Sequence, residues 1–211
     1  MSKVSELILN EVKLAIAEKG LCSFMLTGGR TASLLYKDLF TSFKNFSDLN
    51  KIDFFFTDER SVSPSHRDSN YFMVKKHLFK GEFPKNINIF RMKADSDDMS
   101  KAAEEYTKIL PSSLDVMILT IGDDGHIASL FPFSKQLRED SYKVICVESD
   151  RHPYSRLTIT LPVISKAKRV FVLAIGETKS KMYKKACLKM SDFNKIPAKL
   201  VLDRDWITEI S

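Results

Sequence analysis

The chain has 211 residues, of which 44% are hydrophobic and 28% are charged. These proportions are ordinary for a globular protein and argue against low-complexity disorder. No apolar run approaches the ~18 residues that a membrane-spanning helix needs. We therefore expect a cytoplasmic protein that folds as a single domain over residues 1–211 and has no membrane partner.

The net charge of +6 comes from 33 Lys and Arg residues against 27 Asp and Glu residues. The basic residues are spread along the chain, with only short pairs such as Lys75–Lys76 and Lys184–Lys185. A nucleic-acid surface needs basic residues clustered on one face, so we expect a small anionic ligand and no nucleic-acid partner. The composition does not indicate an oligomeric state.

In chain order, residues 1–19 alternate apolar and charged side chains, which predicts an amphipathic helix rather than a secretory signal. Short runs rich in Ile, Val, Leu and Phe then predict strands buried on both faces. The alternating segment 157–161 predicts a half-exposed or edge strand, and 198–202 is a weaker strand candidate. The buried runs cover residues 22–27, 52–57, 116–121, 143–147 and 170–175.

Helical stretches lie between these strands, with apolar residues repeating on one face. Residues 133–140 are polar and lack clear periodicity, which predicts a loop or a cap beside the main sheet. Strands that alternate with helices indicate an α/β fold, with a mostly parallel central sheet covered by helices on both faces. The helical stretches cover residues 31–40, 70–79, 99–110 and 179–190.

Unusual residues follow four of the predicted strands, at the carboxyl ends where open parallel sheets bind ligands. The first strand is followed by Gly28, Gly29, Arg30 and Thr31, and then by a predicted helix. Glycines let the backbone approach an anion, and a helix N-terminus offers free N–H groups to phosphate. The turn therefore predicts an anion-binding loop, although a purely structural tight turn has the same signature.

Charged residues follow the second and fourth of these strands. Asp58, Glu59 and Arg60 come after an aromatic run, where Arg60 can grip a phosphate or carboxylate or the group can form a local ion pair. Lys179 lies early in a predicted helix, and Arg156 opens the segment 157–161. Both cations are candidates to neutralise a phosphate or an oxyanion, while a solvated lysine is the alternative for Lys179.

The third strand carries the sharpest signal, because His126 follows the turn Gly122-Asp123-Asp124-Gly125 where a helix is expected to begin. Histidine suits proton transfer near neutral pH, since its ordinary pKa is ~6.5. Either Asp123 or Asp124 can orient the ring. We therefore predict that His126 is catalytic. The other histidines, which lack such a setting, are assigned to the surface or to packing: His66, His77 and His152.

Several chemistries are set aside by the motifs. There is no G-x-S-x-G serine elbow and no H-E-x-x-H metal motif. Cys22, Cys146 and Cys187 are far apart and odd in number, so we expect buried reduced thiols rather than disulfides or a zinc site. A base, several cations and an anion-binding turn remain, which suits water activation or proton transfer on a sugar phosphate.

At these residues the sequence resembles the 6-phosphogluconolactonase family. The similarity lies in four blocks: Leu26–Thr31, Phe56–Arg60 with Asp68–Tyr71, Ile121–Pro132, and Arg156–Pro162 with Gly176 and Lys179. The resemblance implies a Rossmann-like three-layer fold and hydrolysis of 6-phospho-D-glucono-1,5-lactone in the oxidative pentose phosphate pathway. It implies no cofactor and no metal.

The resemblance also implies roles for individual residues. His126 is expected to be the general base on water, with Asp124 as its neighbouring acid. The substrate and its phosphate are expected to contact Gly28, Gly29, Arg30, Thr31, Asp58, Arg60, Arg156 and Lys179. Arg30 and Ala32 replace the serine and proline that are usual in the family turn, which leaves the exact phosphate ligands open.

Two alternatives remain at the level of sequence. An aminosugar-phosphate deaminase or isomerase of the same fold uses a similar turn, but such enzymes resemble Phe-Asn-Glu-Pro where this chain has Ser129–Pro132. A non-catalytic sugar-phosphate sensor usually carries a helix-turn-helix segment, for which the residues before the first predicted strand leave no room.

Overall fold

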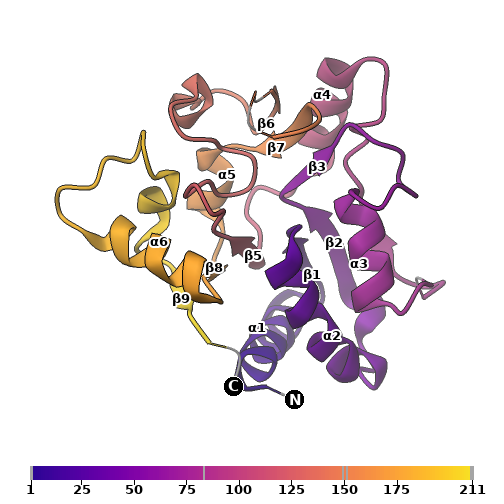
Figure 1. The fold of residues 1–211 in the computed structure, drawn as a ribbon. Helices are drawn as coiled ribbons and strands as arrows, with labels where there is room; N and C mark the ends of the chain where they lie inside the picture. Colours follow the sequence, from indigo (N-terminus) through magenta and orange to yellow (C-terminus); the bar gives the residue numbers. More distant parts are fainter. Residues whose placement is uncertain (1, 83, 149, 151, 210–211) are drawn as a thin grey trace.

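The computed structural model describes residues 2–82, 84–148, 150 and 152–209. Its centre is a six-stranded sheet in the order β4-β2-β1-β5-β8-β9, in which all neighbouring strands are parallel. The predicted α/β fold with a parallel sheet is therefore confirmed (Figure 1). The strands are β1 (Cys22–Leu26), β2 (Ile52–Phe56), β4 (Asn88–Ile89), β5 (Val116–Thr120), β8 (Arg169–Leu173) and β9 (Asp205–Ile207).

The predicted helices are present, with ends that differ by a few residues. Met1, which belongs to the first predicted helix, lies outside the described residues. The short helix α5 was not predicted. The helices are α1 (Lys3–Lys19), α2 (Arg30–Lys44), α3 (Asn70–Leu78), α4 (Met99–Ile109), α5 (Leu161–Lys166) and α6 (Glu177–Cys187).

The aromatic core shows how helices cover both faces of the sheet. Phe43 of α2 packs edge-on against Phe54 of β2, with ring centroids 6.1 Å apart. The next residue of β2, Phe55, points to the opposite face because side chains alternate along a strand. There it meets Tyr106 of α4 at 6.5 Å and stacks on Phe90 at 4.9 Å. Helices α2 and α4 therefore lie on opposite faces, as in a doubly wound sheet.

A second, antiparallel sheet stands beyond the carboxyl ends of the central strands (Figure 1). It consists of β3 (Asp58–Arg60), β7 (Arg156–Ile159) and β6 (Val144–Val147), with β7 in the middle. The edge prediction for 157–161 is therefore wrong, because β7 is buried along its whole length. Conversely, β6 was expected among the strands buried on both faces, but it forms an edge and is only half buried.

Two other expectations, for residues 198–202 and for the cysteines, need correction. Residues 198–202 fall largely in a 3-10 helix, Pro197–Val201, rather than in a strand, because Pro197 begins a helical turn. The polar segment 133–140 contains another, Lys135–Arg138, and a third spans Leu49–Lys51. Of the cysteines, which are all free, Cys22 is buried, Cys146 is half buried and Cys187 is exposed. Among the described residues, no helix combines the length and apolar character needed to cross a membrane.

Candidate active site

A cavity of about 730 Å³ opens at the carboxyl ends of β1, β5 and β8, facing the antiparallel sheet. The parallel sheet brings these strand ends together although they are distant in sequence. All ten residues that the sequence singled out for the site line this cavity: Gly28, Gly29, Arg30, Thr31, Asp58, Arg60, Asp124, His126, Arg156 and Lys179. Their individual roles stay predictions.

Two helices begin at the cavity. Helix α2 starts at Arg30 after Gly29, and α6 starts at Glu177 after Gly176. Both glycines have φ above 90°, a conformation that glycine adopts without steric cost. Neither glycine has a side chain to cap the helix, so the first-turn N–H groups remain available to an anion.

The two carboxylates after β2 hold neighbouring segments together, and Asp58 also lines the cavity. Asp58 accepts hydrogen bonds from Ser129 Oγ at 2.7 Å and from Asn70 Nδ2 at 3.2 Å. Glu59 accepts from the backbone N–H groups of Asn70 and Tyr71 at the start of α3. Burial raises the pKa of Glu59, although these hydrogen bonds oppose that shift. Glu59 is therefore a structural residue, and no local ion pair to Arg60 is formed among the described residues.

Ser129 was not among the predicted site residues, yet it joins three segments. Its hydroxyl donates to Asp58, and the same hydroxyl oxygen accepts from Nη1 of Arg156 at 3.4 Å. Its backbone N–H donates to Thr158 Oγ1 at 3.0 Å. The residue before it, Ala128, has φ of 49°, an uncommon conformation for a non-glycine residue. The chain turns there and carries Ser129 into the contact between the two sheets.

His126 lies in a turn after β5, and the helix expected to begin at this residue is absent. Its backbone carbonyl accepts from the N–H of Gly122 at 2.8 Å, so the chain closes on itself. The ring packs over Gly122, where a Cβ atom would lie 2.2 Å from Cε1 and Nδ1 of His126. Glycine at this position is thus required by the ring, and the turn fixes where the imidazole lies.

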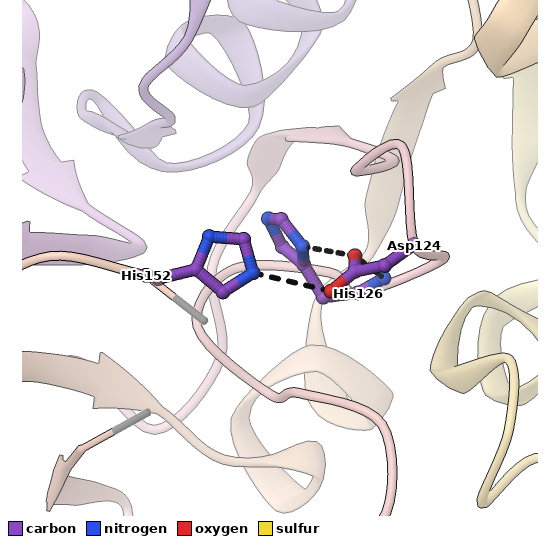
Figure 2. Close-up of side chains that lie close together, drawn as sticks. All are labelled: Asp124, His126 and His152. Atoms are coloured by element: carbon purple, nitrogen blue, oxygen red, sulfur yellow. Dashed lines mark hydrogen bonds and ion pairs between the residues drawn. The ribbon is translucent and has the colours of Figure 1, made fainter. Parts of the chain in front are cut away.

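Asp124 is the acid that orients His126, a choice that the sequence left open with Asp123. Oδ1 of Asp124 lies 2.5 Å from Nδ1 of His126 and also accepts its backbone N–H at 3.1 Å (Figure 2). Burial alone would raise the pKa of Asp124, but hydrogen bonds from His126 and His152 and the proximity of His126 lower it well below its usual range. A carboxylate on Nδ1 favours the tautomer with Nδ1–H, which leaves Nε2 free to accept a proton.

His152 was assigned to the surface or to packing, and the structure shows that this is wrong. It lines the cavity, and its Nε2 lies 3.1 Å from Oδ2 of Asp124 (Figure 2). It comes from the segment between β6 and β7, so no local sequence pattern links it to His126. The only sequence signal was its position four residues before Arg156.

Four arginine and lysine side chains line the cavity. Among the described residues, Arg30, Arg60, Arg156 and Lys179 form no ion pairs. The buried Nε atoms of Arg60 and Arg156 also have no hydrogen-bond partner there. Burial lowers the pKa of Arg156 and of Lys179. Cations held in this state favour binding of an anionic ligand.

Asp124, His126 and His152 each place one ligand-type atom within 4.8 Å of the others, a spacing that a cation can bridge. In the structure these atoms form hydrogen bonds with one another (Figure 2). A carboxylate that accepts hydrogen bonds from two imidazole N–H groups accounts for the arrangement.

The chain belongs to the family of glucosamine-6-phosphate isomerases and 6-phosphogluconolactonases, whose model matches residues 1–208. It is 30% identical over 202 residues to the 6-phosphogluconolactonase of Pseudomonas aeruginosa, and the aligned region covers 92% of this chain and 83% of that protein. It is 31% identical over 192 residues to that of Haemophilus influenzae, covering 87% and 81%.

The fold is also similar to solved structures. The crystal structure of 6-phosphogluconolactonase from Thermotoga maritima matches with a TM-score of 0.81 and 26% identity, covering 96% of this chain and 91% of that one. The family and the fold therefore agree with the resemblance carried by the four sequence blocks.

Proposed function

We propose that this protein hydrolyses 6-phospho-D-glucono-1,5-lactone to 6-phospho-D-gluconate in the oxidative pentose phosphate pathway. The observation that carries the proposal is an oriented imidazole, His126 on Asp124, in a cavity whose cations form no ion pairs with the described part of the chain. The lactonase names of the relatives support the same substrate.

In the proposed reaction, Nε2 of His126 removes a proton from water as the water oxygen attacks the lactone carbonyl. Cations and backbone N–H groups of the cavity stabilise the oxyanion of the tetrahedral intermediate. The protonated His126 then gives its proton to the ring oxygen as the C–O bond breaks, which microscopic reversibility permits. Asp124 keeps the ring oriented and stabilises the imidazolium that forms between the two steps.

The phosphate is remote from the reacting carbonyl, so its binding supplies orientation and affinity rather than chemistry. The helix N-termini of α2 and α6 and the side chains of Arg30, Arg60, Arg156 and Lys179 are the groups available to hold it. Arg30 extends this set, because it stands where a serine is usual in the resembling family and no acid pairs with it among the described residues.

The test is hydrolysis of freshly prepared lactone, with the spontaneous rate subtracted, by wild type and His126→Ala. We expect kcat to fall by about 10²–10⁴-fold in the variant, the usual contribution of a general base. His77→Ala is the matched control, because His77 lies in α3 and does not line the cavity.

Two results would contradict the proposed activity, and a third would contradict the proposed role of His126. Folded wild type that gives no hydrolysis above background and releases ammonia from glucosamine 6-phosphate would be a deaminase. Binding of sugar phosphates without turnover would indicate a sensor. A His126→Ala variant with unchanged kcat would remove this residue from the mechanism while leaving the activity established.

A further inference from the structure

The carboxylate of Asp124 is held by two histidines, each on a different oxygen. Oδ1 faces Nδ1 of His126 at 2.5 Å, and Oδ2 faces Nε2 of His152 at 3.1 Å (Figure 2). His126 is two residues away in the same turn, whereas His152 comes from another part of the chain, 28 residues away. The second contact therefore depends on the tertiary structure.

The ring of His152 is itself fixed by its neighbours. It stacks on Phe131 with centroids 4.6 Å apart and an interplanar angle of 16°. It lies edge-on to the ring of His126 at 5.1 Å. The guanidinium of Arg156 lies over the ring of Phe131 at 5.2 Å. Stacking on Phe131 thus fixes the position of the His152 ring, and in this position its Nε2 lies within hydrogen-bond distance of Asp124.

We propose that His152 is a positioning residue that acts through Asp124 on the base His126; the proposal rests on the function given above. Rotation about the last bond of an aspartate side chain is soft. The two hydrogen bonds from His126, through Nδ1 and the backbone N–H, both fall on Oδ1, so neither of them holds Oδ2. A donor on Oδ2 removes this freedom and reserves Oδ1 for Nδ1 of His126, as outer hydrogen-bond partners do for other functional histidines.

The titratable and charged groups that line the cavity with His152 include side chains from two parts of the chain. Asp123, Asp124 and His126 lie on the turn after β5, and Arg156 lies on β7. The hydrogen bond from His152 is among the contacts that lower the pKa of Asp124, so Asp124 keeps the negative charge that stabilises the imidazolium of His126.

Two substitutions separate the hydrogen bond from the packing. His152→Gln places an amide N–H near the position of Nε2, and so keeps a donor for Asp124. His152→Phe keeps a flat ring that can stack on Phe131 but has no donor. Thermal unfolding of both variants and of wild type controls for loss of fold.

The first readout needs no substrate, so it stands even if the lactonase proposal fails. The ¹⁵N chemical shifts of the His126 ring report which nitrogen carries the proton. We expect wild type and His152→Gln to hold mostly Nδ1–H, and His152→Phe to shift toward a mixture, in the same direction as Asp124→Asn. A His126 ring that is unchanged in His152→Phe, or changed equally in both variants, would overturn the proposal.

The second readout is a double-mutant cycle on lactone hydrolysis. We expect His152→Phe to lower kcat by about tenfold with KM changed less than about twofold, and His152→Gln to retain most of the activity. In an Asp124→Asn background, His152→Phe should change kcat by less than about twofold, because the group through which it acts is gone. An equal loss in both backgrounds, or a loss confined to KM, would show that His152 acts on substrate directly and would refute the positioning role.

Discussion

Charged side chains are arranged differently at two edges of the central sheet: the amino edge, where its strands begin, and the carboxyl edge, where they end. At the amino edge, buried Asp115 accepts from the backbone N–H of Ser23 at 2.8 Å and from its hydroxyl at 2.7 Å. Lys19 and Lys168 pair with the same carboxylate at 2.6 and 3.4 Å. Each oxygen of Asp115 thus pairs with a lysine, and the hydrogen bond from Lys19 leads the groups that lower the pKa of Asp115 against the effect of burial.

At the carboxyl edge, the cations Arg156 and Lys179 lie in the cavity and form no ion pairs among the described residues. A charge without a partner costs stability when it is removed from water. The difference indicates that the paired charges of the amino edge stabilise the fold. The unpaired cations of the carboxyl edge lower stability but are available to bind an anionic ligand. The following substitutions test this comparison.

Lys179→Met is expected to have the largest effect, because it removes an unpaired cation from the cavity. We expect kcat/KM for the lactone to fall by about 10²-fold or more. The melting temperature should rise by roughly 1–3 °C. Lys181→Met is the matched control, since Lys181 lies on the same helix and pairs with Glu177 on the surface.

The pH dependence of this gain has a defined sign. Burial, with Arg30 nearby, lowers the pKa of Lys179 below its ordinary 10.5, although Asp123 opposes this. The unfolded chain therefore binds the proton more tightly than the folded one. The advantage of Lys179→Met should be complete below the lowered pKa of Lys179 and shrink as the pH rises from that pKa toward 10.5. An advantage that grows over this range would contradict the unpaired-charge interpretation.

Gly122→Ala should come next, because it moves the base without removing any charge. A Cβ atom there would lie 2.2 Å from the ring of His126, so the ring must shift. A displacement of about 1 Å costs up to about 10²-fold in rate, so we expect kcat to fall by roughly that factor. Gly20→Ala at the other edge is the control, since no atom lies within 4 Å and only its φ of 80° is strained. Its cost should appear in the melting temperature and not in kcat.

Asp115→Asn should lower stability and leave catalysis intact. Loss of the charge weakens the hydrogen bonds from Ser23 and the pairs with Lys19 and Lys168, at a cost of about 2 kcal/mol. That corresponds to a melting temperature lower by roughly 4–8 °C. Because the folded pKa of Asp115 is lowered, its contribution is present above about pH 4 and is lost as the pH falls further. An unchanged melting temperature at pH 7 would refute this assignment.

Lys19→Met should have the smallest effect of the four. The Lys19 side chain is 42% exposed, and exposed ion pairs contribute about 0.5 kcal/mol. Ser23 and Lys168 still hold Asp115 in this variant. We expect a melting temperature lower by about 1–2 °C, with the difference reduced in 1 M salt. A loss as large as that of Asp115→Asn would mean that Lys19 alone maintains the pairing at this edge.

The strand predictions succeeded where burial and sequence pattern agree. The runs that became β1, β2, β5 and β8 are mostly apolar with little polar alternation, as expected for parallel strands covered on both faces. The pattern failed for β7, where Thr158 alternates with apolar neighbours but its hydroxyl is buried against Ser129. A polar residue with a buried partner looks like a solvent-facing residue in the sequence. The two-residue β4 and three-residue β9 are too short to give a pattern.

The candidate site was predicted as far as its residues are local in sequence. An oriented imidazole can be predicted from the local sequence, because a glycine turn, an acid and a histidine lie within five residues. The parallel strands predict that this turn and the other loops lie together at one edge of the sheet. Which acid orients the ring depends on turn geometry, and the structure selects Asp124. The tertiary structure alone decided three contacts: Asp58 with Ser129, Arg156 with Ser129, and His152 with Asp124. Their residues are 27 to 71 positions apart, and only packing of the second sheet against the first brings them within hydrogen-bond distance.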